Sequence, residues 1–175
     1  WFQNVAIFGT VYTGELDAVW KLHCTGDTEP RYKDFSNIDC WVEDDGHSLV
    51  CEINNAYPSI YYYAVFDLVN TGSIAWHVGP FKIDRGNLPP RTNLYFWGIN
   101  CSTQVHPGDA DTGILILHLK NDAKEGAKYW FRIKGAVAQW NEPFKCGGLC
   151  TGTPCGLPGA LKGLKDLGPY LDKMK

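Results

Sequence analysis

The feature that most constrains this chain is an alternation of side-chain type with a period of two, which recurs between short turn sequences. Successive side chains of a β-strand point to opposite faces, so the alternation predicts strands joined by tight turns. The longest example runs from Ile60 to Asn70. Its apolar residues divide into one face with Ile60, Tyr62, Ala64, Phe66 and Leu68, and another with Tyr61, Tyr63, Val65 and Val69.

Eight to ten strands are expected in all, with no convincing long helix. Aromatic residues, which favour strands, make up 14% of the chain, and 19 Gly and 10 Pro supply turns. Residues 25–37 are expected to form a loop and residues 109–113 a hairpin turn. The 175 residues suffice for one domain with a real core. These features predict an all-β fold, a jelly-roll-like two-sheet β-sandwich over residues 13–144. The other strands are expected near residues 4–12, 16–22, 40–51, 74–83, 91–99, 114–120 and 129–140.

Residues 145–175 differ in character from the rest of the chain. Residues 145–159 are rich in Gly, Pro and Cys and predict an irregular segment. Apolar residues then recur every three or four positions, as on one face of a helix, at Leu161, Leu164, Leu167, Leu171 and Met174. Gly163, Gly168 and Pro169 restrict this to a short, broken helix. We expect residues 145–175 to form a tail that caps its own domain, with docking on a neighbouring molecule as the alternative.

The charge balance argues against several classes of partner. Sixteen basic and nineteen acidic residues give a net charge of −3, whereas nucleic-acid and polybasic membrane binders need a concentrated positive surface. No apolar run has the length of a transmembrane helix. The chain opens with Trp1 and Phe2 rather than Met, which predicts that a signal peptide has been removed and that the protein is secreted.

Seven cysteines make structural disulfides the main expectation for a secreted chain. The spacing of the last three fits no standard zinc-binding pair. An odd number leaves at least one cysteine without an intramolecular partner. The seven disulfide candidates are Cys24, Cys40, Cys51, Cys101, Cys146, Cys150 and Cys155.

Two pairings of Cys40 remain open. Asp45-Gly46 favours a two-residue type I′ turn, and a hairpin folded about it places Cys40 opposite Cys51. Such a loop makes the two cysteines a hydrogen-bonded pair, in which the Cα atoms lie further apart and disulfide geometry is poorer. Cys24 with Cys40 therefore competes with Cys40–Cys51.

The sequence contains none of the common motifs of catalytic sites. No phosphate-binding loop, zinc-protease motif or nucleophile elbow occurs, and the five histidines are never three or four residues apart. Asp109 to Gly113 resembles the start of a calcium loop, but Gly113 and Lys120 stand where that loop needs oxygen ligands. We therefore expect no enzyme activity, no metal and no cofactor.

Two surface features carry alternative hypotheses. Exposed tryptophans could stack on sugars, as in a secreted carbohydrate-binding β-sandwich module, and the candidates are Trp41, Trp76, Trp97, Trp130 and Trp140. Burial of these rings in the core competes with that role. Asn100-Cys101-Ser102 fits the N-glycosylation acceptor pattern, with Asn100 as the modified residue.

Several segments between residues 5 and 142 resemble, in order, the TasA/camelysin-like secreted β proteins and their archaeal bundling-pilus relatives. They are Phe8–Leu16 (FGTVYTGEL), Asp27–Asp34, Asn55–Pro58 (NAYP), Asn70–Ile74 (NTGSI) and Gln139–Glu142 (QWNE). Ala75 replaces the proline that usually follows the isoleucine, and the tail after Lys145 has no counterpart in the family.

The resemblance implies a jelly-roll subunit of an extracellular filament, a pilus or a biofilm matrix fibre. Subunits of this family assemble by donor-strand complementation, in which an N-terminal strand fills a groove of the next subunit. The partners would be identical subunits, and neighbouring filaments in bundles. The donor strand lies within residues 1–12, and its residues are Trp1, Phe2, Gln3, Asn4, Val5, Ala6 and Ile7. A hydrolase of the kind once ascribed to camelysin-like proteins is the remaining alternative.

Overall fold

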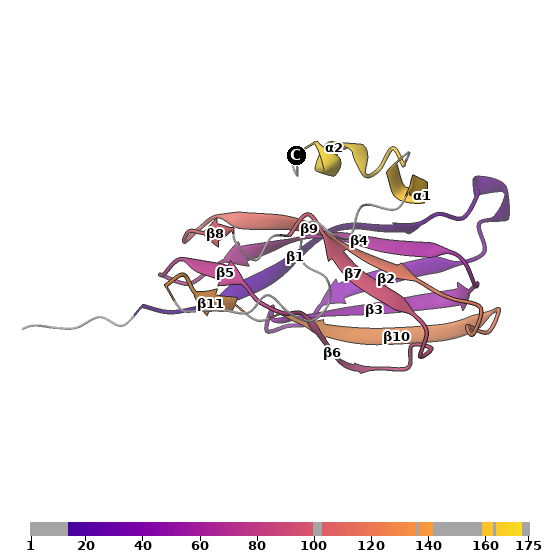
Figure 1. Ribbon diagram of the computed structural model, residues 1–175, viewed down its shortest axis with the longest axis horizontal. Helices are drawn as coiled ribbons and strands as arrows, with labels where there is room; N and C mark the ends of the chain where they lie inside the picture. The colour runs from indigo at the N-terminus through magenta and orange to yellow at the C-terminus, as the bar shows by residue number, and fades with distance from the viewer. Residues whose placement is uncertain (1–13, 100–102, 136, 142–158, 163, 173–175) are drawn as a thin grey trace, which may run out of the picture.

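The computed structural model describes residues 14–99, 103–135, 137–141, 159–162 and 164–172 (Figure 1). These residues form eleven strands, a short 3₁₀ turn and two one-turn helices. The strands are β1 (Ala18–Asp27), β2 (Asn37–Val42), β3 (Ser48–Ala56), β4 (Tyr61–Asn70), β5 (Trp76–Val78), β6 (Lys82–Gly86), β7 (Asn93–Trp97), β8 (Gln104–Val105), β9 (Ala110–His118), β10 (Ala127–Lys134) and β11 (Val137–Gln139). The turn η1 spans Arg31–Lys33, and the helices are α1 (Gly159–Lys162) and α2 (Gly168–Leu171).

The strands form three antiparallel sheets. Sheet A has the order β1-β4-β9-β7 and sheet B the order β2-β3-β10-β6. A small third sheet, β11-β5-β8, lies at one end of the sandwich (Figure 1). The predicted all-β class and two-sheet sandwich are confirmed, and the third sheet is an addition that the sequence did not indicate.

The core lies between sheets A and B. Leu115 and Leu117 of sheet A and Phe131 and Ile133 of sheet B belong to one buried cluster. One of the two faces predicted for residues 60–70 lies in this cluster, with Tyr62, Ala64, Phe66 and Leu68. Its aromatic centre is formed by Trp20, Phe66, Phe81 and Phe96, whose rings contact one another.

The outer face of sheet A is covered by the tail segment, residues 159–162 and 164–172 (Figure 1). Leu161 and Leu167 are fully buried against Val65 of β4 and Ile114 and Ile116 of β9. The capping of the sandwich by its own tail, expected from the leucine spacing, is confirmed for these leucines. Met174 lies outside the described residues.

The turn between β2 and β3 differs from the type I′ prediction. Gly46 has a φ of +76°, but Asp45 is not among the residues with positive φ, whereas a type I′ turn needs positive φ at both central residues. The amide of Glu43 donates to the carbonyl of Ser48, and the amide of Gly46 donates to that of Glu43. The hairpin therefore closes through a four-residue loop, and the hydrogen-bonded pairs of the ladder shift by one residue.

Three other predicted boundaries are wrong. β1 continues to Asp27, so the loop begins later than residue 25. Residues 110–113 belong to β9, and the turn lies at 106–109, where the amide of Asp109 donates to the carbonyl of His106. The strand predicted over 129–140 is divided near Gly135, and its end joins the third sheet as β11.

Candidate functional site

Most of the site residues predicted from sequence lie outside the described residues. This holds for the whole donor strand, Trp1–Ile7, and for the glycosylation candidate Asn100. It also holds for four of the seven cysteines, Cys101, Cys146, Cys150 and Cys155. The structure does describe the other three cysteines, the five candidate tryptophans and the edges of both sheets.

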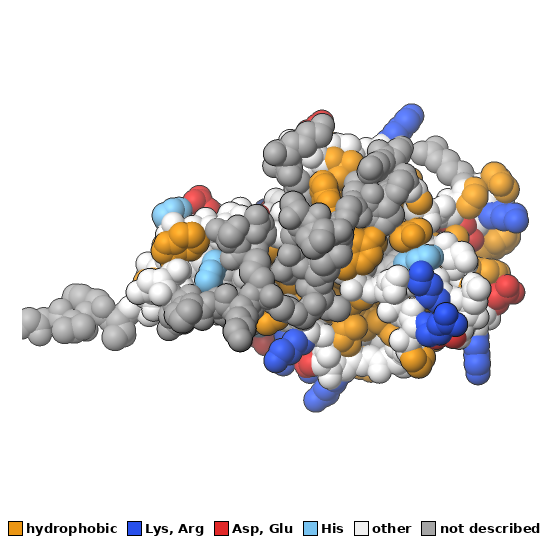
Figure 2. All heavy atoms as spheres, in the orientation of Figure 1, with side chains coloured by type: hydrophobic (Ala, Val, Ile, Leu, Met, Phe, Trp, Pro, Cys, Tyr) orange, Lys and Arg blue, Asp and Glu red, His pale blue; other side chains and the backbone are white. Residues whose placement is uncertain are grey.

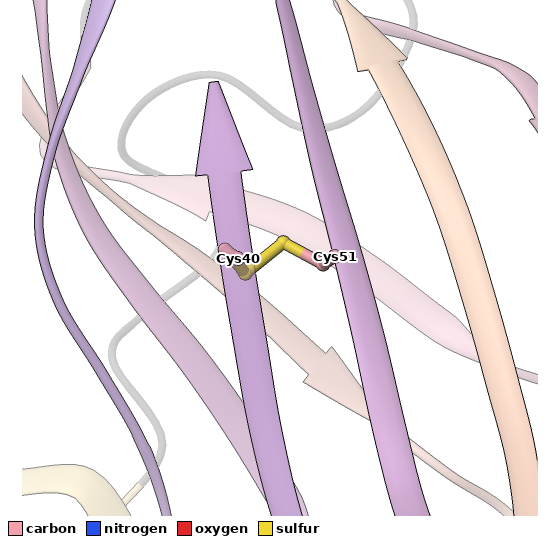
Figure 3. Close-up of a disulfide and its surroundings, with 2 residues drawn as sticks. All are labelled: Cys40 and Cys51. Carbon is pink, nitrogen blue, oxygen red and sulfur yellow. A yellow bond between two sulfur atoms is a disulfide. The ribbon is translucent and has the colours of Figure 1, made fainter. Parts of the chain in front are cut away.

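Cys40 and Cys51 form a disulfide between β2 and β3 (Figure 3). They are opposite one another in the strand register, with Cα atoms 4.1 Å apart. The four-residue loop makes them a non-hydrogen-bonded pair, in which the chains approach closely enough for a disulfide. The competing Cys24–Cys40 pairing is therefore wrong. Cys24 holds a free thiol whose pKa is raised by burial.

Of the five candidate tryptophans, two are buried or half-buried and three are exposed. Trp76 is fully buried, and its indole N–H donates to the carbonyl of Asp17 over 3.1 Å. Trp97 is half-buried and packs beside the tail segment on the outer face of sheet A. Trp41, Trp130 and Trp140 are exposed at 47%, 38% and 46% of their surface. Only these three are accessible for stacking on a ligand.

Trp41 and Trp130 line the same surface cleft. This cleft, which we call the tryptophan cleft, has a volume of about 440 Å³ and lies on the outer face of sheet B. Its lining residues come from all four strands of sheet B and from the residue after β2: Trp41, Glu43, Val50, Glu52, Arg85, Trp130 and Arg132. On the face shown in Figure 2, Lys and Arg side chains are dispersed over the right side and the lower margin, among acidic and apolar side chains.

The charges of the tryptophan cleft are largely paired. The Nε of Arg132 donates to the Asp84 carboxylate over 2.9 Å, and its Nη1 lies 3.5 Å from Glu43. Lys128 pairs with Glu52 at 2.7 Å. The hydrogen bonds from Arg132 lower the pKa of Asp84 to about 2. This ion pair is therefore fully charged at neutral pH.

A second hollow lies where the sandwich is open. β6 and β7 are the last strands of their sheets, and each has one edge without a partner strand among the described residues. Between them is a groove of about 270 Å³, here the edge groove, lined by Ile83, Gly86, Leu88, Pro89, Pro90, Thr92 and Leu94. On the opposite side of the sandwich β1 and β2 contact each other, so that side is closed.

The edge groove exposes part of the core. Ile83 is opposite Ile133 in the register and so points inward, yet it is 41% exposed. Leu94, opposite Leu117, also points inward and is only half-buried. Inward-facing aliphatic side chains at an edge are normally covered, so the groove offers apolar surface to a further strand.

Two of the described histidines lie beside carboxylates. His23 lies 2.8 Å from Asp67, and His47 lies 2.7 Å from Asp17. In the part of the chain that the structure describes, no group of three His, Cys, Asp or Glu side chains could hold a metal ion. Of the described helices, none has the length and apolar character needed to cross a membrane.

The fold and these two hollows define a small all-β sandwich protein with an aromatic cleft on one sheet and an apolar groove between two strand edges. Comparisons with protein-family models, with curated proteins and with solved structures find no match for this chain.

Sequence reasoning found Trp41 and Trp130 but missed the residues that accompany them. Glu52, Arg85 and Arg132 are on different strands, and only the strand register makes them neighbours. The signal that could have found them is the outward position of Arg132 in a strand whose other face is apolar. No comparable signal marks Ile83, because the sequence does not say which strands end a sheet.

Proposed function

We propose that this chain is a structural, non-enzymatic subunit of an extracellular filament, a pilus or a biofilm matrix fibre. Each subunit donates residues 1–7 to the edge groove of the next by donor-strand complementation. The resemblance of residues 5–142 to the TasA/camelysin-like proteins supports this from the sequence. The observation that carries the proposal is the inward-facing Ile83, which is 41% exposed beside β6 and β7, each with one edge unpaired in the part of the chain that the structure describes.

The physical argument starts from the two unpaired edges. A strand at the edge of a sheet presents a row of N–H and C=O groups without β partners, and an added strand satisfies them. In the edge groove the same added strand would also cover Ile83 and Leu94. Hydrogen bonding and burial of apolar surface therefore favour the same occupant at the same place.

The donor strand has the composition that this groove requires. Trp1, Val5 and Ile7 alternate onto one face of an extended segment, and these are the expected groove-filling side chains. A contact between the N-terminal segment of one copy and the groove of another joins two different surfaces. It is head-to-tail and grows into a filament unless rotation closes a ring. The partners are then identical subunits, with neighbouring filaments joining in bundles.

The first test removes either half of the contact. Deletion of residues 1–7 removes the donor, and Ile83→Asp places a charge where the donor must bury apolar side chains, which costs several kcal/mol. We expect each variant to stay monomeric in size-exclusion chromatography with light scattering, while the intact chain forms filaments in electron micrographs. Because Ile83 is partly exposed, the fold should tolerate the change, as circular dichroism would verify.

Mixing the two variants makes the test specific. The Ile83→Asp chain keeps its donor and the deleted chain keeps its groove, so the mixture should give one-to-one dimers and nothing longer. Phe35→Asp is the matched control, because Phe35 is 64% exposed and lies outside the edge groove, and this variant should polymerise normally. Filaments from either single variant, or a mixture that stays monomeric, would contradict the proposal.

A further inference from the structure

The tryptophan cleft has an arrangement that polymerisation does not require. It lies on the outer face of sheet B, where Trp41 of β2, Val50 of β3 and Arg132 of β10 share one register row. Glu52 and Trp130 share the row two residues further along. The two indoles therefore lie diagonally across the cleft, with charged side chains between them and beside them.

The spacing of the two indoles selects an extended ligand. Two strand spacings of about 4.8 Å and two residues of about 3.4 Å put the Cα atoms of Trp41 and Trp130 about 12 Å apart. Rings in contact have centroids about 4.5–7 Å apart. Because the strand positions of the two indoles lie that far apart, the cleft suits an extended ligand with two stacking units better than one small ring.

The polar groups of the cleft favour a neutral ligand. The carboxylates of Glu43, Glu52 and Asp84 are paired with Arg132 or Lys128, so no concentrated charge of one sign is left. Arg85 has neither an ion pair nor a side-chain hydrogen bond with any described residue, and the same is true of the N–H groups of both indoles. Free donors beside paired carboxylates suit hydroxyl groups, which both donate and accept hydrogen bonds.

The size of the cleft distinguishes a glycan from a protein partner. A volume of about 440 Å³ is that of a site for a small chain molecule. A stable protein interface needs about 800 Å² from each partner around an apolar centre. Here the exposed apolar surface is two separate indoles, because Val50 between them is only 7% exposed. The apolar C–H face of a sugar ring fits an indole, and its hydroxyl groups reach the polar rim.

We propose that the tryptophan cleft binds a neutral polysaccharide, with two of its sugar units stacked on Trp41 and Trp130. Arg85 and the indole N–H groups donate to the hydroxyls of the chain, and Glu43 and Glu52 accept from them with the oxygens that their ion pairs leave free. The site is independent of the edge groove, so it functions in a single subunit as well as in a filament.

The test measures binding of the full chain to surfaces coated with barley β-glucan, galactomannan or dextran, by biolayer interferometry. Alginate provides the anionic comparison. We expect saturable binding to at least one neutral polysaccharide, unchanged by added salt because no net charge is neutralised. Trp41→Ala and Trp130→Ala should each weaken it at least about tenfold, as loss of an aromatic anchor does, while Trp41→Phe retains part of the affinity.

Trp140→Ala is the matched control, because Trp140 is as exposed as Trp41 but does not line the cleft. It should bind as the intact chain does. The two cleft tryptophans are surface residues, and circular dichroism would verify that each variant remains folded. Three results would overturn the proposal. They are no binding to any neutral polysaccharide of the panel, binding by the Trp41→Ala and Trp130→Ala variants that is as tight as that of the intact chain, or binding to alginate alone that disappears with salt.

Discussion

At the scale of single residues, neighbours in the sequence belong to different parts of the structure. Leu115 lies in the core between the sheets, and Ile114 and Ile116 beside it lie under the tail segment on the opposite face. The same strict alternation separates Cys51, which points into the core, from Val50, which lines the tryptophan cleft. Whether an apolar residue of a strand lies in the core or on the outer face therefore depends on whether its position is odd or even.

At this scale, the disulfide allows a prediction about the free energy of unfolding. The double variant Cys40→Ala, Cys51→Ala removes the disulfide, which links positions eleven residues apart. A closed loop of that size destabilises the unfolded state by about 3 kcal/mol. We expect the free energy of unfolding, measured by denaturant titration, to fall by about that amount. Cys24→Ser should leave it nearly unchanged, since Cys24 is in no disulfide. Equal stability of the double variant and the intact chain would contradict this.

At the scale of elements, the sequence predicted the strands better than their connections. The apolar runs at 60–70 and 114–120 correctly indicated β4 and the later part of β9, since strands that are covered on both faces carry apolar residues on both. The turn at 44–47 was mispredicted, because Asp45-Gly46 also fits a four-residue loop, in which only Gly46 needs positive φ. The division near Gly135 was missed, because the alternation continues through a change of sheet.

At the scale of elements, we predict how a substitution in the tail segment changes its docking on sheet A. Leu167 is fully buried against sheet A, in a cluster separate from the core. Leu167→Ala should weaken its docking by about 2–5 kcal/mol. Amide hydrogen exchange measured by mass spectrometry should become faster in residues 159–172 and stay slow in β3 and β10. The control is Lys165→Ala, because Lys165 is exposed on the same segment. Accelerated exchange throughout the core would show that the tail is not a separate unit.

At the scale of the whole molecule, the order of the strands decides which surfaces are available. The contact of β1 with β2 closes one side of the sandwich, and β6 and β7 leave the other open. Sequence pattern carries no information on this order, because an edge strand and a central strand can show the same alternation. The edge groove and the tryptophan cleft could therefore be found only from the structure, although their aromatic and aliphatic residues were visible in the sequence.

The two proposed surfaces together make a prediction about the assembled protein. The tryptophan cleft lies on the outer face of sheet B and shares no lining residue with the edge groove, so a filament would present one cleft per subunit. A polysaccharide that spans several clefts binds with an effective concentration that raises its apparent affinity by about 10²–10⁴.

We therefore expect filaments of the intact chain to bind the neutral polysaccharide far more tightly, per subunit, than monomers lacking residues 1–7. Biolayer interferometry on the same coated surface measures both, and filaments of the Trp130→Ala variant provide the control, since they keep the multivalency but lose an anchor in each cleft. The gain should appear mainly as slower dissociation, because every subunit must release before the filament leaves. Equal dissociation rates for filament and monomer would contradict this, because they would show that the polysaccharide engages only one cleft at a time.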